Sequence, residues 1–387
     1  MSSTLVFNPN TYAGKAAGTY LSAALLGAAS LQKGYLKVVP NIKKKRVLRT
    51  LEQEVVFQDA SCNFNADGNT SFGERYLAPV EMSVMYELCF KDLHQSWEAD
   101  MLTGGSGKEQ VPTDLAQFLI RRMQDKISIG IEKLIWQGKV SADFTFTSAF
   151  PGLLALMEAD AEVAKQKTSI GELAISGISI ANPGVVTVAS TATLKTGDKV
   201  TIVGANAATL VGGAAISGQT FSITVLSDTT FSLGVAITGT ATGAAGKVQF
   251  VNQSNVIAVL SSLFNAVPDA VKHSPDFKIF VPMHIADAYR LAQAAVANGS
   301  GTYFSTDKPL NFLGFPLVEL PWFNANTLVA THSNNLFFGT DLLADFNTLQ
   351  IVDMRATTAD QKVRYRANFS ADVNYGFGRE VVLYRPA

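Results

Sequence analysis

Hydrophobic positions recur at helical spacing through residues 113–137, the longest helical pattern in the chain. Thr113 suits the N-cap of such a helix and Gly138 its end. A helix of this length would run about 37 Å, so we expect a spine laid across a sheet. The apolar stripe comprises Leu115, Phe118, Leu119, Met123, Ile127, Ile131, Leu134 and Ile135. The polar face, expected at the surface or against neighbours, comprises Arg122, Gln124, Lys126, Glu132 and Lys133.

Strand-like alternation replaces the helical pattern between residues 51 and 92. Runs at residues 55–57 and 80–90 flank a polar tip, residues 64–73, in which Asp67 and Gly68 are a turn signal. This pattern predicts an extended two-stranded loop. Because a free hairpin is marginally stable in water, we expect the loop to lie on something else, and a second subunit would serve.

Residues 1–50 form an N-terminal arm in this scheme, with a short amphipathic helix expected over residues 11–31. A basic cluster follows that helix: Lys43, Lys44, Lys45, Arg46 and Arg49. Such a cluster suits contact with nucleic acid or with an acidic neighbouring subunit. A solvated link between two elements explains it equally well, and the sequence leaves these readings open.

Charged residues nearly vanish between residues 170 and 251, where Gly, Ala, Thr, Ser and Val dominate. Short β-like runs recur at residues 185–189, 199–203, 220–226, 230–233 and 247–251. Strands at this spacing, with turn signals between them, predict an all-β sandwich or barrel. Because the flanking sequence is helical or mixed, we expect a separate domain inserted into a host domain. The run GDKVTIVG (197–204) followed by GQTFSITVLSDTTFSL (218–233) resembles small β-modules that decorate phage structural proteins.

The flanking regions divide the remaining chain into three parts. Residues 93–169 contain the long helix and two shorter ones, at 93–101 and 150–164, and form an expected peripheral domain. Residues 252–335 alternate helix, strand and helix, at 254–267, 277–281 and 283–297, which predicts a compact axial α/β domain. Residues 336–387 read as closing strands that return to the peripheral and axial core. The predicted fold class is therefore α+β.

Composition indicates that much apolar surface is either buried in a large core or covered by partners. The 387 residues are 47% hydrophobic and only 16% charged, which favours an obligate assembly. A net charge of −1 argues against a protein that coats nucleic acid electrostatically. Two cysteines are too few for a disulfide framework. With neither a signal-peptide pattern nor a long enough apolar run to span a membrane, we expect a soluble protein made in a cytoplasm.

The sequence contains residue types that occur in catalytic and cofactor-binding motifs, but their spacing does not match those motifs. The histidines, His94, His273, His284 and His332, show no metal-ligand pattern. The Gly-Ser-Gly-Lys run at 105–108 lacks the earlier glycine of a phosphate-binding loop, and Glu109 stands where Ser or Thr is needed. Glu158, Asp160 and Glu162 read as a solvated helix face. We therefore expect no catalytic residue, no cofactor, no metal site and no enzyme activity.

A family resemblance emerges from the last eighty residues. The run NFLGFPLVELPWF (311–323) is followed by a strand at 327–331, then NLFFGTD (335–341), LQIVD (349–353), the alternating run KVRYRANFSADVNY (362–375) and REVVLY (379–384). This order resembles the C-terminal half of tailed-phage major capsid proteins. Gly339-Thr340-Asp341 departs slightly from that family's more familiar Gly-Asp. The arm, extended loop, spine helix and axial domain follow the same template in order.

The resemblance implies the coat fold shared with herpesvirus capsid floors and encapsulins. Hexamers and pentamers would tile an icosahedral shell around double-stranded DNA, bound without sequence specificity. Scaffold, portal and decoration proteins are implied partners, and the implied location is the virion, assembled in a host cytoplasm. Assembly contacts are expected at the basic cluster, at Asp67 and Gly68 in the loop tip, and at Arg122 and Lys133 on the long helix.

Two other functions stay open at this point. An encapsulin-like compartment would hold a cargo enzyme in a similar shell. A phage tail or adhesion protein built around the β-module would use the insert for binding, but would leave the long helix unexplained.

Overall fold

A computed structural model describes most of the chain in two compact units. The described residues are 11–13, 27–53, 57, 69–89, 113–139, 149–166, 170–205, 208–211, 213–239, 242–243, 246–296, 310–321, 323, 326–341, 348–354, 360 and 362–385. The first unit comprises Met1–Leu156 and Ser333–Phe377, and the second comprises Met157–His332 and Gly378–Ala387. Each is described by itself.

A six-stranded sheet organises the first unit around one long strand, β23 (Lys362–Tyr375). One edge of β23 pairs with β5 (Val80–Cys89) over ten residues. Along its length β23 also pairs with β22 (Thr348–Asp353) and, nearer its end, with β21 (Leu336–Thr340). Outer strands β1 (Thr11–Ala13) and β2 (Lys37–Val39) complete the sheet. The predicted closing strands thus unite segments from both ends of the sequence.

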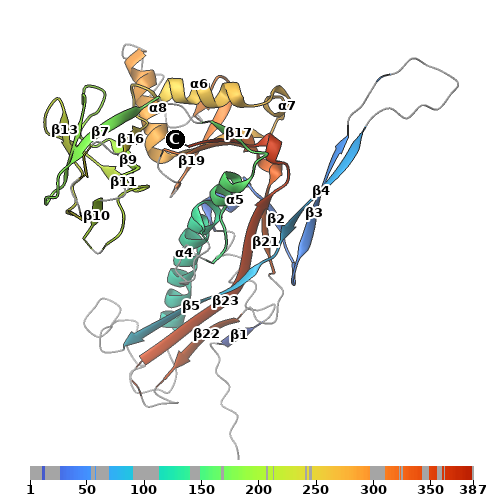
Figure 1. The fold of residues 1–387 in the computed structure, drawn as a ribbon. Coiled ribbons are helices and arrows are strands. Elements are labelled where there is room, and N and C mark those ends of the chain that lie inside the picture. The colour runs from blue at the N-terminus through green and yellow to red at the C-terminus, as the bar shows by residue number, and fades with distance from the viewer. Residues whose placement is uncertain are drawn as a thin grey trace, which may run out of the picture. The chain divides into compact units, whose positions relative to one another are not determined.

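The long helix α4 (Thr113–Gln137) has the predicted bounds. Figure 1 shows it alongside β5 and β23. Ile127, Ile131 and Leu134 are buried and line a small apolar cavity with Met82 of β5 and Phe369 of β23. The prediction of a spine packed on the sheet is confirmed for this part of α4, because these buried residues of the apolar stripe lie beside those strands.

The extended loop is a ribbon of two strands whose predicted bounds were wrong. β3 (Arg46–Gln53) pairs with β4 (Thr70–Leu77) as a separate antiparallel sheet (Figure 1). The run predicted as its return strand is instead β5 of the large sheet. Periodicity alone could not separate them, since β4 carries Gly, Ser and Glu where a buried strand would carry apolar residues.

The predicted arm helix over residues 11–31 was also wrong where the structure describes it. Thr11–Ala13 forms β1, and a single short helix, α2 (Ala29–Gln32), follows later. Sheet pairing with β22 overrides the weak helical pattern there. The predicted helix at 93–101 lies outside the described residues.

In the second unit, a second six-stranded sheet carries two helices over a shared core (Figure 1). α6 (Val256–Ala266) and α8 (Met283–Val296) pack on it, close to their predicted positions, while α7 (Asp269–Lys272) is a single turn. The segment after α5 (Leu153–Ala159) belongs here rather than to the predicted peripheral domain. The sheet comprises β18 (Asn311–Phe312), β19 (Phe315–Leu320), β17 (Phe277–Pro282), β20 (Leu328–His332), β24 (Val382–Tyr384) and β6 (Ala164–Gln166).

The insert contains only strands and turns in its described residues, as predicted. Its eight-stranded sheet runs β11-β9-β16-β7-β8-β13-β12, with β15 also on β7, and encloses its own apolar core. The strands are β7 (Glu172–Ile178), β8 (Val185–Val188), β9 (Lys199–Val203), β11 (Thr220–Ser222), β12 (Thr224–Val225), β13 (Thr230–Ser232), β15 (Thr242–Gly243) and β16 (Lys247–Phe250). A small sheet of β10 (Ala208–Leu210) and β14 (Ile237–Gly239) accompanies it. An α+β fold with an inserted all-β domain is confirmed.

Candidate assembly surfaces

One face of the β3–β4 ribbon carries two solvent-exposed apolar cross-strand pairs, with the charged pair Arg49–Glu74 between them. Val47 stands opposite Tyr76, and Leu51 stands opposite Phe72. Their exposed fractions are 41%, 42%, 52% and 75%, respectively. A two-stranded ribbon has no second layer with which to cover such side chains, and grouped exposed apolar residues mark interaction sites. We refer to Val47, Leu51, Phe72 and Tyr76 as the ribbon stripe.

The predicted basic cluster lies at the ribbon root, which we define as residues 43–49. Lys43, Lys44 and Lys45 are exposed in the link before β3, and Arg46 begins the strand. Lys45 Nζ lies 3.4 Å from the centre of the Tyr76 ring, a cation–π contact. Arg49 Nε lies 3.7 Å from Glu74 Oε1. The cluster is therefore continuous with the ribbon stripe.

Side chains of β23 anchor the ribbon where β4 ends. Leu77 is fully buried with Val39 and Ile42. The Ala78 N–H donates to Asp372 Oδ2 at 2.7 Å, and Asn374 Nδ2 donates to the Tyr76 carbonyl at 2.8 Å. Burial raises the pKa of Asp372 to about 6, while the hydrogen bonds from Ala78 and Val373 act in the opposite direction. Sequence reasoning missed Asp372, because it is one polar residue in an alternating strand.

The segment that departs from the family pattern packs beside this anchor. A Cβ atom on Gly339 would lie 2.9 Å from Ile42 Cδ1 and 3.3 Å from Leu77 Cβ, so glycine permits the close approach of β21. Thr340 Oγ1 donates to the Ser370 carbonyl at 2.7 Å, and the Asp341 N–H donates to Ser370 Oγ at 3.3 Å. The Gly-Thr-Asp sequence thus serves packing and strand pairing.

The polar face of α4 is only partly as predicted. Arg122 is exposed, and Lys133 is half-buried about three turns further along the helix. Glu132 was predicted to be exposed, but it is buried beneath α2. Its carboxylate accepts the Ser30 N–H at 2.9 Å and the Ser30 hydroxyl at 2.5 Å, and the Trp136 indole donates to Ser30 Oγ. Burial raises the pKa of Glu132, and the Ser30 hydrogen bonds oppose that shift.

Asp67 and Gly68, the remaining predicted contacts, lie outside the described residues. The structure therefore brings Lys43, Lys44, Lys45, Arg46 and Arg49 together with the ribbon stripe, and places Arg122 and Lys133 separately on α4.

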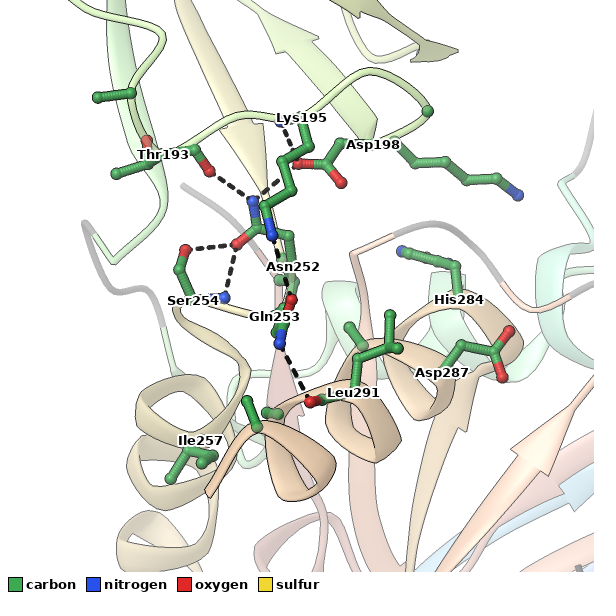
Figure 2. Close-up of a pocket in the computed structure, with 17 residues that line it drawn as sticks. Thr193, Lys195, Asp198, Asn252, Gln253, Ser254, Ile257, His284, Asp287 and Leu291 are labelled. Atoms are coloured by element: carbon green, nitrogen blue, oxygen red, sulfur yellow. Dashed lines mark hydrogen bonds between the residues drawn. The ribbon is translucent and has the colours of Figure 1, made fainter. Parts of the chain in front are cut away.

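A cleft of about 620 Å³ lies within the second unit, between the insert and α8 (Figure 2). Ile257 and Leu291 form part of its apolar wall. Gln253 bridges its two sides, because its amide donates to the Leu291 carbonyl and accepts from Lys195 Nζ. Asn252 donates to the Thr193 carbonyl and to Asp198 Oδ2.

Polar groups around the cleft bond mainly to one another. The fully buried Asn326 donates to Thr201 Oγ1 at 3.0 Å and to the Gln249 carbonyl at 3.3 Å, both in the insert. Asn326 Oδ1 also lies 3.2 Å from His284 Nε2, and burial lowers the pKa of that imidazole. This hydrogen-bond set joins the insert to the host domain. Spacing could not have found it, because its members lie far apart in sequence.

The described residues bear on the predictions about metal ligands, histidines and membrane spans. No cluster of three His, Cys, Asp or Glu side chains there is arranged to hold a metal ion. His332 Nε2 contacts Glu380 at 2.7 Å, an isolated pair. His94 lies outside the described part of the chain. Among the described helices, none is long and apolar enough to cross a membrane.

Comparison with known proteins yields similar structures only. No protein-family model and no curated protein matches the sequence. The satellite phage P4 procapsid, including its size determination (Sid) protein, is similar at 13% identity over 95% of this chain and 98% of that chain, with a TM-score of 0.47. Gordonia phage Cozz is similar at 10% identity over 92% and 86%, with a TM-score of 0.48. The capsid of Myoviridae phage XM1 is similar at 12% identity over 100% and 96%, with a TM-score of 0.46. At these values the likeness concerns the course of the chain and assigns no role to a side chain.

Proposed function

We propose that this chain is a major capsid protein, whose copies form hexamers and pentamers of an icosahedral shell around double-stranded DNA. The ribbon stripe carries the proposal. Val47, Leu51, Phe72 and Tyr76 stay exposed on a ribbon whose root is firmly anchored. Burying these apolar side chains against a neighbouring copy removes them from water, which favours association of the two subunits.

The geometry of the ribbon suits a closed shell. Because the stripe lies on a projecting element, it meets a different surface on the next copy, and such heterologous contacts close into rings when the rotation permits. Repetition over many subunits makes each modest contact effective. The α4 face that carries Arg122 supplies a second contact region.

The near-neutral chain suits a container for nucleic acid. With a net charge of −1, a shell would enclose DNA without the tight phosphate binding that hinders release. The protein then acts structurally rather than as an enzyme. Scaffold, portal and decoration proteins are its expected partners, and it would assemble in the host cytoplasm and remain in the virion.

Electron microscopy of the purified protein tests the proposal. Closed shells that contain DNA support it, whereas shells holding a protein cargo indicate a compartment and tubes or fibres indicate a tail component. A matched pair of variants tests the stripe. Leu51→Ser should reduce shell yield at least tenfold, while Leu226→Ser, at a similarly exposed leucine of the insert, should leave it unchanged. Equal yields from both variants would overturn the role of the stripe.

A further inference from the structure

The cleft between the insert and α8 is kept open by small side chains. It lies within the second unit and has a volume of about 620 Å³, inside the range of about 300–1,000 Å³ that ligand pockets occupy. Ala288, Ala292 and Ala295 are spaced by four and three residues, so they lie on one side of α8, and all three line the cleft. Their short side chains leave space that a larger group can fill.

Two large apolar side chains are exposed in this cleft. Ile257 of α6 is 44% exposed, and Leu291 of α8 is 55% exposed. Because both line the same cleft, an apolar group that fills it would cover both. Grouped exposed apolar residues of this kind mark binding sites.

Lys195 brings a positive charge to the cleft and forms no ion pair with a carboxylate in the described part of the chain. Its Nζ donates to Gln253 Oε1 at 3.3 Å, and Gln253 Nε2 donates in turn to the Leu291 carbonyl at 3.1 Å. Figure 2 shows these two bonds in line across the cleft. An ammonium group has three donors, so Gln253 holds Lys195 beside the apolar wall and leaves two donors for water or a ligand.

The two carboxylates that line the cleft are already bonded within the chain. Asp198 Oδ2 accepts the Lys195 N–H at 2.9 Å and Asn252 Nδ2 at 2.8 Å. Asp287 Oδ1 accepts Arg290 Nη1 at 2.8 Å. The cleft is therefore suited to an apolar group that brings its own carboxylate to the ammonium of Lys195.

We propose that the cleft binds a peptide segment of a partner protein, in which leucine-like side chains stand next to a glutamate or aspartate. The apolar side chains of that segment would cover Ile257 and Leu291, and its carboxylate would reach Lys195. The inference goes beyond the proposed shell function, because the residues that carry it belong neither to the ribbon nor to α4.

Polar groups along the cleft favour a peptide over a free fatty acid. Ser254 Oγ donates to Asn252 Oδ1 at 2.6 Å, which leaves its lone pairs to accept a peptide N–H. The hydroxyl of Thr193 forms no hydrogen bond with another described residue. A peptide backbone offers partners to both groups, whereas an alkyl chain would cover them without replacing the hydrogen bonds that they make to water.

Binding of a defined peptide pair to the unassembled chain tests the proposal. The probe is Gly-Leu-Glu-Ala-Leu-Leu, labelled with a rhodamine dye at its N-terminus and amidated at its C-terminus, and its matched control has Gln in place of Glu. Fluorescence anisotropy should show about threefold tighter binding of the glutamate peptide, as an exposed ion pair allows. Lys195→Met should remove that difference by weakening only the glutamate peptide. Leu291→Ser should weaken both peptides about fivefold, because an apolar contact is lost.

Matched variants outside the cleft serve as controls. Lys247→Met removes another exposed lysine of the insert, and Leu226→Ser removes a leucine that is 57% exposed. Neither residue lines the cleft, so neither variant should change the affinity for either peptide. Thermal unfolding of each variant establishes that it folds.

Each contrary outcome has a distinct meaning. If neither peptide binds the unaltered chain, or if Lys195→Met weakens both peptides equally, the proposal is overturned. Tighter binding of decanoate than of the glutamate peptide, measured by displacement, would overturn it in favour of a free amphiphile. Lower shell yield in Lys195→Met without peptide binding to the unaltered chain would overturn it in favour of a contact between copies. If the unaltered chain binds the peptide but forms no shells, the proposed function fails and this inference stands, because peptide binding is measured before assembly.

Discussion

The carboxylate of Glu132 accepts two hydrogen bonds from Ser30, a residue 102 positions earlier in the chain. These bonds attach α2 to the C-terminal part of the long helix inside the first unit. Because both residues are buried, the contact stabilises the fold and takes no part in a surface.

Removing that carboxylate should destabilise the subunit. Glu132→Ala leaves the Ser30 N–H and hydroxyl without their acceptor, and we expect a loss of about 3 kcal/mol in the free energy of unfolding. Urea denaturation of the unassembled chain measures it. Lys126→Ala, at an exposed position of the same helix, should stay within about 0.5 kcal/mol. Equal effects of the two variants would contradict a specific bond.

Asp372 should make stability depend on pH. Burial raises its pKa from 3.8 to about 6 in the folded state, so the folded protein holds this proton more tightly than the unfolded chain. The contribution of the protonated Asp372 side chain to the free energy of unfolding is therefore fully present below pH about 4. It is lost as the pH rises through about 6. A shift of about two pKa units corresponds to about 3 kcal/mol.

Comparison with Asp372→Asn isolates that contribution. The difference in unfolding free energy between the unaltered and variant proteins should fall by about 3 kcal/mol from pH 4 to pH 7. Asp228→Asn, at an exposed position of the insert, provides the control and should show no such trend. A pH-independent difference for Asp372→Asn would refute the assignment.

Charge reversal on α4 should separate assembly from folding. Arg122→Glu changes an exposed side chain, so we expect reduced shell yield with an unfolding free energy within about 1 kcal/mol of the unaltered value. Lys133→Glu should impair folding as well, because Lys133 is half-buried. Arg121→Glu reverses the adjacent exposed charge on a different side of the helix. If it lowers shell yield as much as Arg122→Glu, the position of the charge is irrelevant.

Asn326 should control how firmly the insert is held. Its backbone φ of 59° is left-handed, so Asn326→Gly preserves the conformation while removing hydrogen bonds to the insert. We expect a loss of about 1–3 kcal/mol and faster hydrogen exchange at Thr201 and its neighbours. Asn182→Gly, within an exposed insert turn, offers a comparison distant from this contact. Unchanged exchange in Asn326→Gly would show that packing alone holds the insert.

Much of the fold could be predicted because its elements have strong local signals. The α4 bounds and the β23 bounds follow from periodicity, and the insert follows from its composition. The ribbon bounds could not be predicted so well. β4 is exposed on most of its length, so no apolar alternation marks it, and its pairing with β3 decides the register.

The location of the candidate site in the fold could be predicted only in part, for a related reason. Clustered cations are visible in sequence, so the ribbon root was found, but the residues that orient it were not. Asp372 and Asn374 act on β4 across almost three hundred positions, and Glu132 reads as one more charge on a polar helix face. Such roles depend on which strands and helices meet, which spacing within one element does not encode.

The place of β23 in the chain also sets the order in which a newly made subunit becomes functional. β5 emerges from the ribosome well before the strand that pairs with it over ten residues, and the ribbon anchor needs Asp372 and Asn374 of that same late strand. A partly synthesised chain therefore has no oriented ribbon to offer its neighbours. We therefore expect that nascent chains on one messenger RNA do not join through the ribbon before β23 of each chain has been made.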